Sequence, residues 1–107
     1  MKRLLISGLL IAAFSSMAMA EEGDPRAGLE FSQHVCSPCH AVAAGHSPLY
    51  EATPFKDVAN QPGMTGTALA VWLQSSHPTM PNFILEKQDM LNVIAYILTL
   101  KDESTSQ

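Results

Sequence analysis

The chain has 107 residues, of which ten are acidic and six are basic, so its formal net charge is −4. This length allows one small domain. The acidic balance argues against nucleic-acid binding, which requires a basic surface.

The first twenty residues have the features of a secretory signal peptide. Lys2 and Arg3 give a basic start, an apolar run extends over residues 4–14, and small residues ending at Ala20 form an A-x-A-like cleavage site. The run is shorter than the ~20 apolar residues that a membrane-spanning helix needs. We therefore expect residues 1–20 to be cleaved rather than kept as an anchor. The mature domain, 21–107, should then be periplasmic and not inserted in a membrane.

The mature domain would be small and strongly acidic. Cleavage removes two of the six basic residues and none of the ten acidic ones, so the formal charge moves from −4 to −6. So short a chain buries only a marginal apolar core, and its fold needs a further stabilising element such as a covalent cross-link or a bound group. A disulfide between Cys36 and Cys39 would close too small a loop to stabilise the fold much.

The first expected helix runs from about Pro25 to Val35. Asp24 suits its N-cap, and proline suits the first helical position. Gly28 lies in mid-helix, where glycine costs ~1 kcal/mol relative to alanine. Its expected use is the close approach of another helix.

This helix leads into Cys36-Ser37-Pro38-Cys39-His40, a C-x-x-C-H pattern. The pattern is the covalent attachment signature of c-type haem. Two thiols on one turn can form thioethers to the two haem vinyl groups, and the histidine that follows can ligate the iron. C-x-x-C also occurs in thioredoxin-like redox pairs and in half of a zinc site, so the surrounding chain must decide.

The middle of the chain alternates loops with short helices. Residues 41–55 contain two prolines and should form an ordered loop. In so small a domain a loop of this length needs a surface to pack against, such as a haem edge. A short helix is expected over 56–60, and another begins after Thr65 or Thr67 as its cap. Residues 79–83 form a second proline-bounded loop.

The last helix, from about Glu86 to Leu100, has the clearest pattern. Its apolar residues recur at i, i+3, i+4 and i+7. No stretch shows the two-residue alternation of a strand, so the predicted fold class is all-α. The apolar positions are Met90, Leu91, Val93, Ile94, Ile97 and Leu98.

Taken together, these segments resemble a class I c-type cytochrome, a small monohaem bacterial cytochrome c. The resemblance covers nearly the whole mature sequence and implies the cytochrome c fold, a few helices packed around one covalently bound haem. It also implies that the terminal helices cross, with Phe31 and Tyr96 meeting Gly28. The matching pieces, in the family's order, are the helix with Gly28, the C-x-x-C-H motif, Ser47-Pro48-Leu49, Met80-Pro81 and the last helix with Tyr96.

The resemblance also implies the residues that hold the haem. Cys36 and Cys39 would form the thioethers, His40 would be the proximal axial ligand, and Met80 the distal one. Pro48 matches the loop proline whose carbonyl accepts a hydrogen bond from the proximal imidazole, a contact that would raise ligand basicity.

Other side chains keep alternatives open. Met64 and His77 compete with Met80 as sixth ligand. Tyr50 and Trp72 could donate hydrogen bonds to haem propionates, although Trp72 could equally pack in the core. His46 could contact a propionate or simply lie in the loop.

The resemblance implies a soluble periplasmic one-electron carrier and not an enzyme. We expect a monomer with transient redox partners, a dehydrogenase or quinol-oxidising complex as donor and an oxidase or another cytochrome as acceptor. The alternatives are a haem c enzyme or gas-binding protein with a displaceable sixth ligand, or an electron-transfer subunit of a periplasmic dehydrogenase. The missing strands argue against a haem-free dithiol oxidoreductase, and the missing second ligand pair argues against zinc.

Overall fold

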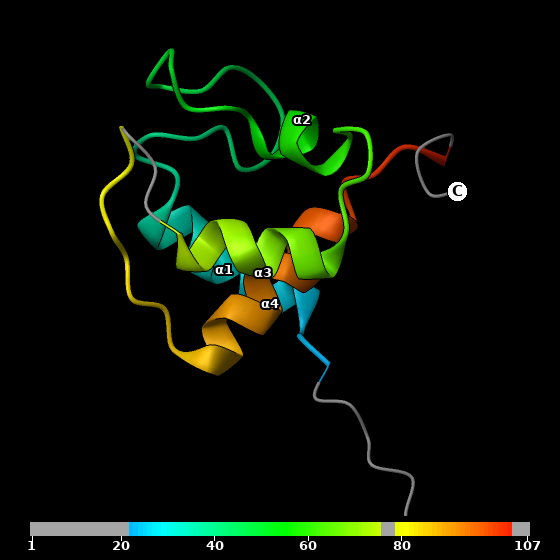
Figure 1. Ribbon diagram of the computed structural model, residues 1–107. Helices are drawn as coiled ribbons and strands as arrows, with labels where there is room; N and C mark the ends of the chain where they lie inside the picture. The colour runs from blue at the N-terminus through cyan, green and yellow to red at the C-terminus, as the bar shows by residue number, and fades with distance from the viewer. Residues whose placement is uncertain (1–21, 76–78, 104–107) are drawn as a thin grey trace, which may run out of the picture.

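The computed structural model describes residues 22–75 and 79–103, and within them it contains four α-helices and no strand. The predicted all-α class is confirmed. Figure 1 shows α1 and α4 crossing behind α3, with α2 above α3 in this view. The helices are α1 (Pro25–Val35), α2 (Phe55–Ala59), α3 (Gly66–Gln74) and α4 (Lys87–Leu98).

Local capping explains where the helices begin. Asp24 caps α1 by accepting a hydrogen bond from the Arg26 amide at 2.9 Å, and the predicted bounds of this helix are confirmed. Thr65, and not Thr67, caps α3, because its hydroxyl accepts from the Ala68 amide at 3.1 Å.

The two remaining helices are slightly displaced from their predicted ranges. The structure begins and ends α2 one residue earlier than the expected 56–60. It ends α4 at Leu98, because the chain tightens there: the Leu100 amide donates to the Ile97 carbonyl at 2.9 Å, an i to i+3 bond.

The crossing of α1 and α4 depends on the absence of a side chain at Gly28. A β-carbon at this position would overlap the carbonyl oxygen of Asn92 and lie 2.8 Å from Cβ of Tyr96. Phe31 packs against the apolar core that contains Tyr96. The predicted meeting of Gly28 with Tyr96 at this crossing is confirmed. The contact is fixed further by Asn92, whose Oδ1 accepts from the Asp24 amide at 2.8 Å.

The apolar core lies mainly along α4 and brings the shorter helices onto it. Ala59 of α2 and Leu69 of α3 are buried in the same cluster as Val93 and Ile97 of α4. Burial of apolar area of this kind supplies the main favourable term in folding. The buried members of the cluster are Val42, Phe55, Ala59, Leu69, Val93, Ile94, Tyr96 and Ile97.

Polar contacts attach the segment after α2 to the end of α4. Asn60 Nδ2 donates to the Leu100 carbonyl at 3.0 Å, and Asn60 Oδ1 accepts from the Asp102 amide at 2.7 Å. Lys101 Nζ donates to the Met64 carbonyl at 2.5 Å. These contacts hold the connection between α2 and α3 in place, and that connection forms one wall of the site described below.

The predicted signal peptide, residues 1–20, lies outside the described residues. In the part of the chain that is described, no helix is both long and apolar enough to cross a bilayer.

Candidate functional site

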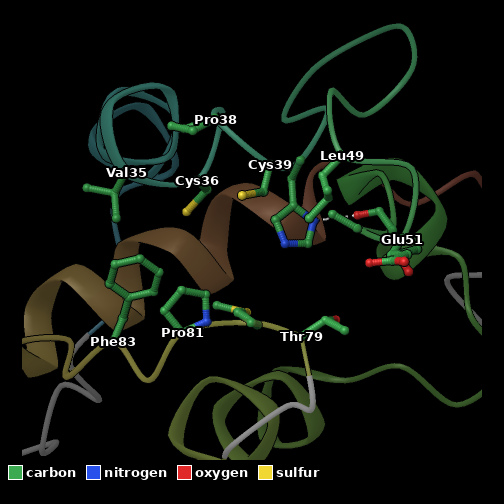
Figure 2. A pocket seen from close by; sticks show the side chains of 13 residues that line it. Val35, Cys36, Pro38, Cys39, Leu49, Glu51, Thr79, Pro81 and Phe83 are labelled. Carbon is green, nitrogen blue, oxygen red and sulfur yellow. Dashed lines mark hydrogen bonds between the residues drawn. The ribbon is translucent and has the colours of Figure 1, made fainter.

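A cavity of about 250 Å³ opens beside the C-x-x-C-H segment. Figure 2 shows Cys36 and Cys39 on one side of it, with Thr79, Pro81 and Phe83 on the opposite side. The complete lining is Val35, Cys36, Pro38, Cys39, His40, Leu49, Glu51, Ala52, Thr53, Thr79, Met80, Pro81 and Phe83.

A second cavity, of about 260 Å³, lies beside the first and shares His40, Thr53 and Met80 with it. Its wall is mostly apolar and comes from α2, α3, α4 and the connection before α3. The residues that line the second cavity and not the first are Phe55, Val58, Gln61, Met64, Leu69, Trp72, Leu73 and Ile97.

The end of α1 places both cysteines and His40 on one turn. The His40 amide donates to the Cys36 carbonyl at 2.9 Å, and the Cys39 amide donates to the same oxygen at 3.2 Å. The following loop folds back onto this turn, since the Leu49 amide donates to the Cys39 carbonyl at 3.1 Å and the Ala41 amide donates to Ser47 Oγ at 3.0 Å. The motif is therefore held rigidly against the cavity.

The orientation of the His40 imidazole is set by Thr53. Nδ1 lies 2.7 Å from the Thr53 carbonyl oxygen, and a carbonyl can only accept, so Nδ1 is the protonated nitrogen. Phe55 packs beside the ring, with the two ring centroids 5.4 Å apart. In the neutral ring Nε2 then carries the lone pair, which is the form of the ring that ligates a metal.

The carbonyl that accepts from His40 is that of Thr53, and the prediction that assigned this role to Pro48 is wrong. Pro48 is exposed and lines neither cavity. Thr53 directly precedes Pro54, and a residue before proline is held in extended backbone, which fixes the direction of its carbonyl. The sequence signal for the acceptor was thus the second proline of the loop.

Met80 borders both cavities and lies in the chain between Thr79 and Pro81, which Figure 2 shows across the first cavity from the two cysteines. Met64 lines only the second cavity, away from the two cysteines. His77 lies outside the described residues. The structure therefore brings Cys36, Cys39, His40 and Met80 together around one space, as the predicted ligand set requires, and places Met64 at its margin.

The structure places the two predicted propionate donors, Trp72 and Tyr50, in different surroundings. Trp72 lines the second cavity and is 55% exposed, so it lies at the cavity's mouth and not within the core. Tyr50 is 99% exposed and lines neither cavity, so the structure places it away from the predicted site. His46 is likewise exposed outside both cavities.

Sequence reasoning missed Glu51, a carboxylate on the wall of the first cavity, because no pattern marks it.

No disulfide joins the two cysteines, so both thiols are available to form thioethers with the haem. Before the haem is attached, burial raises the pKa of the Cys36 thiol above its ordinary value of 9.0. Within residues 22–75 and 79–103, no three His, Cys, Asp or Glu side chains gather as a metal-binding cluster.

The donor set and the lining fit a haem. Two thiols with C-x-x-C spacing face the same space as an imidazole with an available nitrogen and a thioether. The remaining wall is largely apolar, as a macrocycle with a large apolar surface requires.

The comparison with known proteins agrees with this chemistry. The chain is 33% identical over 94 residues to "Cytochrome c-552" of Bradyrhizobium diazoefficiens, an alignment that covers 87% of this chain and 90% of that protein. The chain belongs to the small c-type cytochromes. No protein-family model and no solved structure matches it.

Membership of this family accounts for the fold and the cofactor. The four helices form the all-α cytochrome c fold, and the chain carries covalent haem c, for which Cys36 and Cys39 have the required spacing. The chain is accordingly a haem c electron-transfer protein.

Proposed function

We propose that this c-type cytochrome is a soluble, monomeric carrier of single electrons in the periplasm, with its haem iron ligated by His40 and Met80. The observation that carries the proposal is that these two residues border both cavities, while the two cysteines open into one of them. The bound haem supplies the redox chemistry, one electron at the iron.

The residues of the chain prepare the two axial positions. Thr53 holds the proton on Nδ1 of His40 and so presents Nε2 to the cavity. Met80 offers a soft, neutral thioether, which favours iron(II) and raises the reduction potential. Because both ligands would come from the chain, substrate would find no open position. This supports a carrier over an enzyme or a gas-binding protein.

Rigidity of the ligand positions suits electron transfer. His40 follows a turn fixed by two bonds to the Cys36 carbonyl, and Phe55 buttresses its ring. A site that changes little between its two oxidation states has little to reorganise. Transient docking to a donor, a dehydrogenase or quinol-oxidising complex, and to an acceptor, an oxidase or another cytochrome, would complete the function.

The proposal is tested by spectroelectrochemical titration of holoprotein produced with haem-maturation machinery. We expect one reversible one-electron step and no binding of carbon monoxide or azide under native conditions. Ready binding of carbon monoxide by the reduced protein would contradict the carrier and favour the gas-binding alternative. Amino-terminal sequencing of protein recovered from the periplasm should start at Glu21, and retention of residues 1–20 would contradict the proposed export.

A further inference from the structure

One side of the molecule is made from a stretch that carries no charge. From residue 58 to residue 85 the sequence has no Asp, Glu, Lys or Arg, and all ten acidic and six basic residues lie outside it. In the structure this stretch supplies α3 and the segment that carries Met80. We call residues 66–75 and 79–85 the uncharged face.

The uncharged face exposes large apolar side chains. Ile84 is 98% exposed and Val71 of α3 is 60% exposed. Trp72, next to Val71 in α3, lies at the mouth of the second cavity, where a bound haem would cover part of its ring. Single exposed apolar residues are ordinary, but several of them on a charge-free surface indicate an interaction site. Figure 1 shows α3 at the front of the molecule, with the segment from residue 79 onward passing the end of this helix.

A groove of about 290 Å³ joins the two parts of the uncharged face. One wall is the end of α3, residues 73–75, and the other is residues 81–84. The groove shares Pro81 and Phe83 with the first haem cavity and Leu73 with the second. A protein seated in it would therefore lie directly beside the haem.

We propose that the uncharged face is the docking surface for a redox protein whose own cofactor edge opens in an uncharged, apolar surface. The inference rests on the proposed carrier function. The charge distribution carries the choice of partner, because a strongly basic partner would be drawn to the acidic remainder of the chain and not to this face. Docking through apolar contact alone predicts association that hardly depends on salt.

The test is the second-order electron-transfer rate of the holoprotein with two probes of known charge. The apolar probe is a purified blue-copper protein whose copper lies beneath an uncharged apolar surface. The basic probe is a cytochrome whose haem edge is ringed by lysines. Each rate is measured between about 10 mM and about 1 M salt, over which the Debye length falls from ~30 to ~3 Å.

We expect the rate with the apolar probe to change by less than about twofold over this range, because no charge steers the encounter. Ile84→Lys places a charge on the uncharged face at a residue that is almost fully exposed and should lower that rate about tenfold. The matched control is Gln33→Lys, which makes the same change of net charge at an exposed residue of α1 that lines none of the three cavities. It should leave the rate within about twofold of wild type.

Two outcomes would overturn the docking proposal. One is a rate with the apolar probe that falls steeply with salt or responds equally to Ile84→Lys and Gln33→Lys. The other is a concentrated holoprotein that sediments as a dimer, with Ile84→Lys restoring the monomer, which would assign the face to a second copy of the chain. A redox titration of the same samples distinguishes failure of the carrier function from failure of the docking surface. A normal one-electron titration together with a salt-dependent rate would contradict only the docking surface.

Discussion

The imidazole of His40 donates from Nδ1 to the backbone carbonyl of Thr53, at 2.7 Å. A hydrogen bond to a metal-ligating histidine raises the basicity of the ligating nitrogen. A more basic ligand stabilises the oxidised iron, so this contact should lower the reduction potential of the haem. The acceptor is a backbone carbonyl, so no substitution of Thr53 removes it. Pro54 restricts the backbone of Thr53, however, so a substitution of Pro54 can weaken the contact.

Pro54→Ala should raise the reduction potential. The substitution releases the Thr53 backbone and weakens the bond to His40, and we expect a rise of roughly 20–60 mV, up to about a tenfold change in a one-electron equilibrium. Pro48→Ala is the matched control, because Pro48 is exposed and its carbonyl does not accept from His40. Equal shifts in the two variants, measured by redox titration, would contradict this role of Thr53.

Gly28→Ala should destabilise the fold through the helix crossing. The new methyl group would overlap the Asn92 carbonyl, so α1 and α4 must move apart, at a cost of about 1–3 kcal/mol. Gly66→Ala serves as control, because its methyl would meet only side-chain atoms at ordinary contact distances, Ile94 Cγ2 at 3.5 Å and Leu98 Cδ1 at 3.7 Å, and alanine should stabilise α3 by ~0.4–1 kcal/mol. Denaturant unfolding of the two holoproteins measures both values. A Gly28→Ala variant as stable as wild type would show that α1 and α4 can accommodate a methyl group at this position, which would contradict the prediction.

Tyr96→Phe should cost stability at neutral pH. The Tyr96 hydroxyl donates to the buried Val42 carbonyl at 2.5 Å, and the variant leaves that oxygen without a donor, at a cost of about 1–3 kcal/mol. Tyr50→Phe, at a fully exposed tyrosine, should leave the free energy of unfolding unchanged.

The same residue should give an alkaline pH dependence. Burial raises the pKa of Tyr96 above its ordinary value of 10.0. Its contribution to stability is therefore complete below pH 10 and is lost as pH rises through the higher pKa of the folded state. Wild type should lose more stability than Tyr96→Phe over that alkaline window. If the free energies of unfolding of wild type and Tyr96→Phe fell equally with rising pH, ionisation of Tyr96 would not contribute to the loss of stability and the prediction would be contradicted.

Much of the fold follows from local patterns in the sequence. Asp24 with Pro25 defines the start of α1, and the i, i+3, i+4, i+7 pattern defines α4, because caps and apolar periodicity act within a few residues. The role of Gly28 was predictable because only glycine permits so close an approach of two helices.

The site was predictable where its chemistry is local and failed where it depends on the path of a loop. Cys36, Cys39 and His40 stand on one turn, so their spacing carries their geometry. The choice between the Pro48 and Thr53 carbonyls, and the outward direction of Tyr50, depend on how the loop folds back onto the motif. Hydrogen bonds from distant residues fix that path, and no short pattern reports them.

The central claim, that Met80 is the sixth ligand, is tested most directly by paramagnetic NMR of the holoprotein with Met80→Ala and Met64→Ala. We predict strongly shifted methionine methyl signals and a methionine-to-iron(III) charge-transfer band in wild type and in Met64→Ala, because Met64 lines only the second cavity. Both features should vanish in Met80→Ala, with a lower reduction potential. Their survival in Met80→Ala, or their loss in Met64→Ala, would contradict the account.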